Sequence, residues 1–246
     1  MKQAQRNKAM IKNMLLLIGM LWSTTFSIAQ DFRTELFRMN DTYRKADNFS
    51  MKVNVKIYEK QSDTRERQSY EGMVKKQGNN YLSQMMGKTT LVNNNCVLLV
   101  DEGNKLIQYG DRPKDKKNPT DDKALCYAID SVYLANNKLK MLSSEEGHMR
   151  ILVSSEGDEV YEKTEILINT VSHVLEELTY YYKDEEKAGF SKIVISYSEV
   201  KLHAAFGKSD FSEKKYITAS RNSITLAANY ASYKLIDQRN FNSNGL

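Results

Sequence analysis

The stretch NFSMKVNVKIYEK, residues 48–60, decides the fold class of this chain. From residue 49 to residue 57 its odd-numbered positions are apolar, and the positions between them are polar. An alternation with a period of two is typical of a β-strand that turns one face to a core and the other to water. The stretch therefore predicts a half-buried strand of an antiparallel sheet, with a core face formed by Phe49, Met51, Val53, Val55 and Ile57.

The segment before this strand has a different period. In DFRTELFRMNDTYRKA, residues 31–46, apolar residues recur at helical spacing, and most other positions are charged or polar. This pattern predicts one amphipathic helix with an apolar stripe formed by Phe32, Leu36, Met39 and Tyr43.

The segments that follow the strand are short, strand-like and separated by turn residues. A first meander of strands is expected over residues 69–76, 81–86, 89–94, 96–101 and 105–110. A second meander is expected over residues 149–155, 159–170, 172–183 and 190–202, with a last strand near 233–238. In the hairpin VLLVDEGNKLIQYG, residues 97–110, we expect Gly103 and Asn104 to supply the positive φ of a tight turn.

A second helix is expected between the two meanders. Apolar residues at helical spacing predict it over residues 121–137, with Thr120 or Asp121 as its N-cap. The charged stretch 111–123 contains both prolines of the chain. It is expected to be either a solvated loop or a flap near a binding site.

These elements add up to a mainly β (α+β) fold, in which a strongly curved antiparallel sheet is covered by two or three helices. One face of each strand is apolar and has to be covered, and the amphipathic helices are the elements that can cover it. Such a sheet either fills its interior with side chains or keeps an apolar cavity.

Residues 1–29 have the features of a cleaved secretory signal peptide. Four basic residues precede the short apolar core at residues 14–22, and Ser27-Ile28-Ala29 forms a small-x-small cleavage site. The apolar core is shorter than the roughly 20 residues that span a bilayer. We therefore expect a single mature domain over residues 30–246 that is soluble in the periplasm and not an integral membrane protein. The alternative is an uncleaved N-terminal anchor.

The leader also accounts for most of the net positive charge of the chain. It holds four of the 36 basic residues and none of the 31 acidic residues, so the remaining chain has a net charge of +1. A nucleic acid partner would need a concentrated basic excess. We therefore expect no nucleic acid partner.

No catalytic machinery is visible in the sequence. A nucleophile motif is absent, and Gly87-Lys88-Thr89 lacks the preceding glycine of a phosphate-binding loop. His173 and Glu177 would share a strand face, a spacing that favours a surface hydrogen bond over a metal site. We therefore expect that the protein is not an enzyme and uses no cofactor and no metal.

The two cysteines, Cys96 and Cys126, leave two alternatives open. In an oxidising compartment they could pair and close a loop of about 30 residues, which would stabilise the fold by ~3 kcal/mol in the chain-entropy model. Otherwise they are two buried free thiols that act as small hydrophobic residues.

Three segments resemble, in their order and spacing, the periplasmic outer-membrane lipoprotein carriers of the LolA-like family. Residues 48–59 resemble the family's first long strand. EGMVKKQGNNYL, residues 71–82, resembles its glycine-containing segment, and LVDEGNKLIQY, residues 99–109, resembles its L-V-x-D-G-x-x-L-W-x-Y hairpin. The resemblance covers most of residues 31–202. Lys76 replaces the family's arginine, and Ile107 replaces its tryptophan.

This resemblance implies one LolA-like domain that carries lipoprotein acyl chains, or other apolar cargo, between the inner and outer membranes. Burial of an acyl chain contributes about 0.8 kcal/mol per CH₂, so no catalytic residue is required. Lys76 would hold a lid, although lysine lacks the fork of donors that arginine offers. The expected cargo-binding lining consists of Phe49, Met51, Val53, Val55, Ile57, Met85, Ile107 and Tyr109, unless these residues only pack on the helices.

A second function remains open on the same fold. Because the family's arginine and tryptophan are replaced, the chain could instead be a non-enzymatic adaptor or sensor that binds envelope proteins. In either case we expect a monomer.

Overall fold

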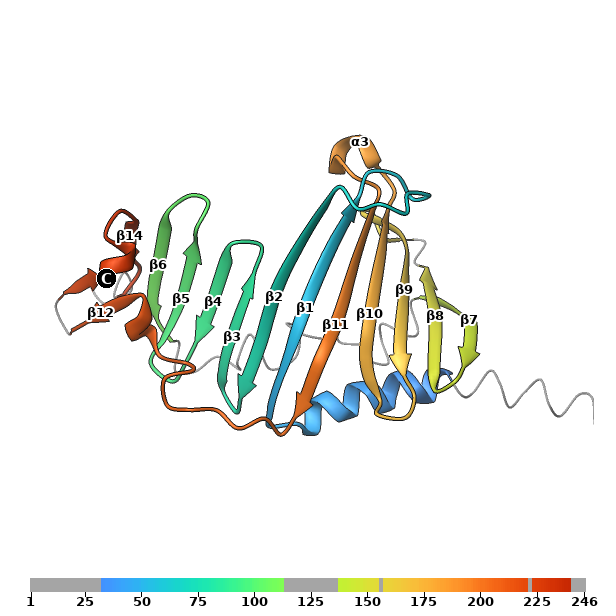
Figure 1. Ribbon diagram of the computed structural model, residues 1–246, viewed down its shortest axis with the longest axis horizontal. Helices are drawn as coiled ribbons and strands as arrows, with labels where there is room; N and C mark the ends of the chain where they lie inside the picture. Colours follow the sequence, from blue (N-terminus) through green and yellow to red (C-terminus); the bar gives the residue numbers. More distant parts are fainter. Residues whose placement is uncertain (1–31, 113–136, 155–156, 221–222, 240–246) are drawn as a thin grey trace, which may run out of the picture.

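The computed structural model describes residues 32–112, 137–154, 157–220 and 223–239, and most of these residues lie in β-strands (Figure 1). The expected signal peptide, the helix expected over residues 121–137 and Cys126 lie outside the described residues. The mainly β class and the curved sheet expected from the sequence are confirmed.

Twelve strands of the described part of the chain form one open sheet, with β14 and β7 at its two edges (Figure 1). Its spatial order is β14-β6-β5-β4-β3-β2-β1-β11-β10-β9-β8-β7. The first meander consists of β1 (Asn48–Tyr58), β2 (Gln68–Gln77), β3 (Asn80–Met85), β4 (Lys88–Val92), β5 (Cys96–Asp101) and β6 (Leu106–Asp111). The second consists of β7 (Lys138–Glu145), β8 (His148–Ser154), β9 (Tyr161–Asn169), β10 (Val174–Tyr182) and β11 (Lys192–Leu202).

The two meanders meet in the middle of the sheet. There β1 pairs antiparallel with β11, from Phe49 opposite Leu202 to Tyr58 opposite Lys192. The one parallel pair of the sheet, among the described strands, joins β14 (Lys234–Asp237) to β6. The sheet is therefore mixed rather than purely antiparallel.

Helical elements are few among the described residues. Residues 32–45 are helical, and this helix crosses the sheet near one end of β11, β10, β9 and β8 (Figure 1). The single turn α3 (Glu185–Ala188) follows β10 and has Asp184 as its N-cap. The C-terminal segment follows β11 and is described over residues 203–220 and 223–239. It contains two 3₁₀ turns, η1 (Glu213–Lys215) and η2 (Ala228–Tyr230), and the small hairpin of β12 (Ile217–Ala219) and β13 (Ile224–Leu226).

In the turn between β5 and β6, the positive φ lies at a different residue from the two that the sequence predicted. The residue with positive φ is Lys105, at 47°, and neither Gly103 nor Asn104 has a positive φ. The Asp101 carboxylate accepts hydrogen bonds from the backbone and side-chain nitrogens of Asn104, at 3.0 and 2.9 Å. These side-chain bonds fix the turn, so the left-handed residue moves to the start of β6.

The pairing register shows which side chains share a face. Directly opposite residues of an antiparallel pair point to the same side of the sheet. We call the side of the odd-numbered β1 residues the inner face, because helix 32–45 packs there. The register carries this face through Val55, Ile195, Leu178, Ile166 and Ile151.

In the other direction the register carries the inner face across β2 to β6. Met51 lies opposite Val74, and the ladder continues through Ser83, Thr90 and Leu99 to Gln108. The neighbours of Gln108 in β6, Ile107 and Tyr109, therefore lie on the outer face.

Two hydrophobic cores result, on opposite faces of one sheet. The first lies on the inner face and includes the apolar stripe of helix 32–45. The second lies on the outer face of β3 to β6 and is covered by the C-terminal segment through Phe211, Tyr216 and Ile217. Alternation within a strand shows which of its residues share a face. Only the pairing register between strands shows which of the two faces of the sheet that is.

Candidate functional site

The inner face is the largest apolar surface of the described chain. The five predicted β1 residues, Phe49, Met51, Val53, Val55 and Ile57, lie on it together and are between 2% and 6% exposed. Strands β8, β9 and β10 continue the surface with residues that include Met149, Ile151, Val153, Ile166, Ile168, Leu178 and Tyr180. This face could hold an apolar chain without any polar partner.

Helix 32–45 packs its apolar stripe onto this face. Leu36 and Met39 are fully buried, and Phe32 and Tyr43 are buried at the two ends of the stripe. Leu175 donates its backbone N–H to the Tyr43 hydroxyl at 3.3 Å, and the Tyr43 ring stands edge-on to Phe49. The helix therefore contacts both the start of β1 and the start of β10.

A buried carboxylate fixes the other end of the helix. Glu35 is 3% exposed, and its Oε2 atom lies 2.9 Å from Nδ1 of His173 in the turn between β9 and β10. Its second oxygen accepts a hydrogen bond from Arg38 at 2.7 Å. His173 therefore contacts Glu35 and not Glu177, the partner that the sequence suggested. Glu177 instead accepts a hydrogen bond from Arg150 on the outer face at 3.1 Å.

The inner face of β11 is less completely covered than its neighbours. Ile193, Ile195 and Tyr197 are partly exposed, although β11 lies in the middle of the sheet. Their direct partners in β1, Ile57, Val55 and Val53, are buried. A stripe of accessible apolar atoms therefore runs along the centre of the inner face.

Met85 also belongs to the inner side of the sheet. It packs, partly buried, against the first core. A Cβ atom on Gly72 would lie 2.6 Å from the Met85 Cγ atom and even closer to the Gln84 carbonyl oxygen. Glycine at position 72 therefore lets the end of β3 pass over β2.

Ile107 and Tyr109 do not join this lining. Both are buried in the second core on the outer face, with Ile107 0% and Tyr109 6% exposed. The expected single lining therefore divides between the two faces. The aromatic residues of the C-terminal segment, which cover this second core, were the sequence signal for it.

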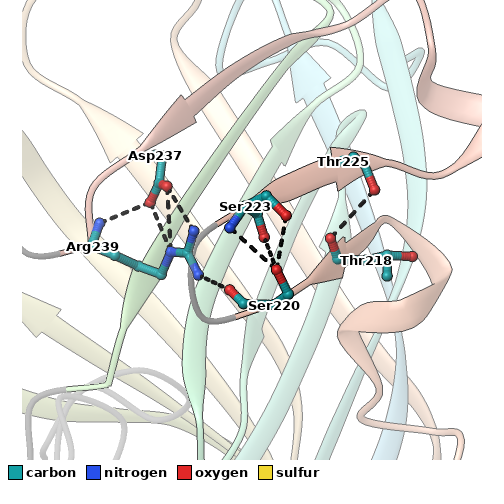
Figure 2. A network of polar contacts seen from close by, with 6 residues as sticks. All are labelled: Thr218, Ser220, Ser223, Thr225, Asp237 and Arg239. Carbon is teal, nitrogen blue, oxygen red and sulfur yellow. Dashed lines mark hydrogen bonds and ion pairs between the residues drawn. The ribbon is translucent and has the colours of Figure 1, made fainter.

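Arg239 closes the outer core above Tyr109. Its guanidinium carbon lies 5.4 Å from the centre of the Tyr109 ring, and its Nη1 atom donates to the Ser220 carbonyl oxygen at 2.7 Å. Figure 2 shows how Arg239 also pairs with Asp237 and reaches the end of the β12–β13 hairpin, where Ser220 and Ser223 bond each other. Tyr109 therefore stacks beneath a structural ion pair.

Lys76 lies on the inner face, between Phe49 of β1 and Tyr81 of β3. Its side chain makes no hydrogen bond or ion pair with any described residue. Its expected role in holding a lid therefore stays a prediction. The polar contacts that hold helix 32–45 come from Glu35 and Tyr43 instead.

Cys96 is fully buried in the second core, and among the described residues it has no disulfide partner. Burial, with the Glu213 carboxylate nearby, raises the pKa of its thiol to about 12. Because Cys126 lies outside the described residues, the disulfide stays a prediction.

The described residues contain neither a candidate metal site nor a membrane-spanning helix. No group of three or more histidine, cysteine or acidic side chains could hold a metal ion in the part of the chain that the structure covers. Within the same residues, every helix is too short or too polar to cross a bilayer.

No protein-family model and no curated protein sequence matches the chain. An uncharacterized conserved protein from Thermus thermophilus is similar in structure, with 8% identity and a TM-score of 0.47 over 83% of this chain and 98% of its own. A LolA superfamily protein from Nitrosomonas europaea has 12% identity and a TM-score of 0.32, over 74% of this chain and 97% of its own. A chain of the MucA/MucB complex of Pseudomonas aeruginosa has 10% identity and a TM-score of 0.39, over 80% of this chain and 63% of its own length.

A LolA superfamily protein is thus among the structures that are similar to this chain. All three likenesses have identities of 12% or less and TM-scores below 0.5.

Proposed function

We propose that the protein is an exported, non-enzymatic binder of acyl chains, and that it carries lipoproteins or other apolar cargo between the two membranes. The acyl chain would lie on the inner face of the sheet, along β11 and beside helix 32–45. The observation that carries this proposal is the partly exposed stripe of Ile193, Ile195 and Tyr197 in the middle of an otherwise buried apolar face.

The chemistry of the face fits such a ligand. Burial of an acyl chain contributes about 0.8 kcal/mol per CH₂, so a chain of moderate length needs only apolar contact. The methionines on this face, Met51, Met85 and Met149, are flexible and polarizable, which suits a fluid ligand.

Helix 32–45 would be the element that moves when cargo enters. It covers the face with one apolar stripe, and Glu35 and Tyr43 hold it to the β9–β10 region by polar contacts. A short amphipathic helix has little stability of its own, so its place depends on these contacts and on the packed stripe.

Two neighbouring residues of β11 offer a matched test. Ile195 lies on the inner face opposite Val55, and Val194 lies on the outer face opposite Lys56. We expect Ile195→Asn to weaken binding of a fluorescent fatty acid at least tenfold, because it places an amide in the acyl-binding stripe. Val194→Asn changes the same strand on the other face, so its affinity should stay within twofold of the wild type. Equal affinities for both variants would contradict binding on the inner face.

Export is tested separately. N-terminal sequencing of the protein from the periplasmic fraction should give Gln30 as the first residue. Recovery of the uncleaved chain with the membrane fraction would contradict export as a soluble protein.

A different result would favour the adaptor function. Purified protein without bound lipid, without fatty acid affinity and with a stable envelope protein partner would show that the fold serves protein binding. In that case the β11 variants should leave partner binding unchanged.

A further inference from the structure

The sheet has a free strand edge in its interior, next to β2. On one side, every residue of β2 from Gln77 to Gln68 pairs with β1. Strand β3 pairs with β2 only from Gln77 to Met73. Among the described residues, no strand pairs with residues 68–72 on that side, and Figure 1 shows β3 and β4 ending short of the corresponding end of β2.

The register shows which backbone groups face this edge. Gly78 donates its N–H to the Asp47 carbonyl oxygen at 2.8 Å, so the pair of positions 47 and 78 is hydrogen-bonded. In an antiparallel ladder, hydrogen-bonded pairs alternate with non-bonded pairs. Tyr70 and Gly72 therefore bond β1, and Ser69 and Glu71 turn their N–H and C=O groups toward the free edge.

Because Gly72 has no side chain, β3 can leave the ladder at this point. The site of its missing Cβ atom is occupied by the Gln84 carbonyl oxygen and the Met85 side chain on the inner side. The end of β3 therefore crosses to the inner side of β2 instead of continuing beside Glu71. The edge beyond Gly72 stays open on the outer side.

A cleft of about 510 Å³ lies at this open edge. Its walls include Glu71 and Met73 of β2, Met86 and Lys88 at the β3–β4 turn, and Glu102 at the β5–β6 turn. The methionine side chains give it an adaptable apolar surface.

The charges of the cleft favour a basic ligand. Its two lysines already have acidic partners, since Lys52 pairs with Glu199 and Lys88 lies 3.8 Å from Asp101. Glu71 and Glu102 form no ion pair with any described residue. The carboxylates left without partners would attract a cationic side chain.

We infer that this cleft binds an extended peptide segment of a partner protein, which adds as a strand beside Ser69 and Glu71. Backbone donors and acceptors at strand spacing are complementary to another backbone, and an acyl chain offers neither. The segment would combine apolar residues, which contact Met73 and Met86, with basic residues, which pair with Glu71 and Glu102. This inference does not depend on the proposed acyl binding.

The probe is a fluorescent hexapeptide of alternating valine and lysine, measured by anisotropy. It should bind, and the amide resonances of Ser69 and Glu71 should shift more than those of other strands. The same peptide with valine and glutamate should bind at least tenfold more weakly. An equal affinity of the acidic peptide, or unchanged amides of Ser69 and Glu71, would overturn the inference.

A pair of variants separates backbone pairing from charge. Glu71→Pro removes the N–H that faces the edge, and Glu71→Gln keeps that N–H while removing the same charge. We expect Glu71→Pro to bind the basic peptide at least fivefold more weakly than Glu71→Gln. Equal affinity of two folded variants would contradict strand addition.

Two further measurements control for misfolding of the proline variant and for binding of the peptide on the inner face. If Glu71→Pro does not fold, a basic peptide N-methylated at alternate residues tests the same bonds on the wild-type protein, and equal binding of methylated and unmethylated peptides would contradict strand addition. Ile195→Asn should leave peptide affinity unchanged. A loss of peptide binding in that variant would place the peptide on the inner face and overturn the inference.

Discussion

Glu35 and His173 lie 138 positions apart in the sequence, and the structure joins a carboxylate oxygen of one to the Nδ1 atom of the other at 2.9 Å. The contact ties the buried side of helix 32–45 to the turn between β9 and β10. The helix covers the inner face, so this pair helps to decide how firmly the face is closed.

Loss of the Glu35 carboxylate should destabilise the fold. Glu35→Ala removes the acceptor of both His173 and Arg38 from a buried position. Removal of a partner from a buried polar contact costs about 1–3 kcal/mol, and we expect a decrease of that size in the free energy of unfolding in urea. Arg33→Ala is the control on the same helix, because the Arg33 side chain is exposed and pairs with no described residue, and it should leave the urea midpoint unchanged. Equal midpoints for all three proteins would show that the tie contributes nothing.

Gly72 should tolerate no side chain. In Gly72→Ala the new methyl group would overlap the Gln84 carbonyl oxygen and the Met85 side chain, so we expect a loss of about 1–3 kcal/mol, as for an overpacked core. Gly110→Ala is the matched change in another strand, because the nearest atom to its Cβ position, on Gln238, is 3.6 Å away. Thermal unfolding should distinguish the two variants. If Gly110→Ala is the less stable protein, the close approach at Gly72 is wrong.

The Tyr181 hydroxyl should make stability depend on alkaline pH. Burial and the Glu165 carboxylate, which accepts its hydrogen bond at 3.0 Å, raise the pKa of Tyr181 from 10.0 to about 12. Because the pKa is higher in the folded state, the contribution to stability is present below pH 10 and is lost as the pH rises toward 12. Urea unfolding between pH 9 and pH 12 should therefore show a smaller decrease for Tyr181→Phe than for the wild type. Parallel pH profiles would contradict the raised pKa.

The C-terminal segment should belong to the same cooperative unit as the sheet. Ile217 is 0% exposed in the second core, and truncation of a buried isoleucine to alanine costs about 2–5 kcal/mol. Ile217→Ala should therefore lower the unfolding midpoint of the whole protein, and the exposed Thr218→Ala should not. A separate early transition of the C-terminal segment, with the main transition unchanged, would show that the segment folds independently.

Much of the fold could be predicted from local patterns. The alternation in residues 48–60 and the turn residues between the later strands gave β1 to β6 and β8 to β11 to within a few residues. The pattern failed where burial is weak: β7 is an edge strand with mostly exposed residues, and the β12–β13 hairpin has three residues in each strand. Short or solvent-exposed strands leave little apolar periodicity to detect.

The candidate site could be predicted only in part. The β1 residues share one face because they lie in one strand, where alternation alone decides. Ile107 lies five strands away from β1 in the sheet, and its face depends on the register of every intervening hairpin. A shift of one residue in any of them exchanges the two faces, so sequence pattern alone could not place Ile107 and Tyr109.

The central claim is that the protein holds acyl chains in its native compartment. The most direct test is to purify the mature protein from the cell envelope, extract it with organic solvent and analyse the extract by mass spectrometry. The account predicts acyl chains in stoichiometric amount, with a marked loss in the Ile195→Asn variant and none in Val194→Asn. An extract free of lipid from the folded wild-type protein, together with no release of lipoproteins from inner membranes, would contradict it.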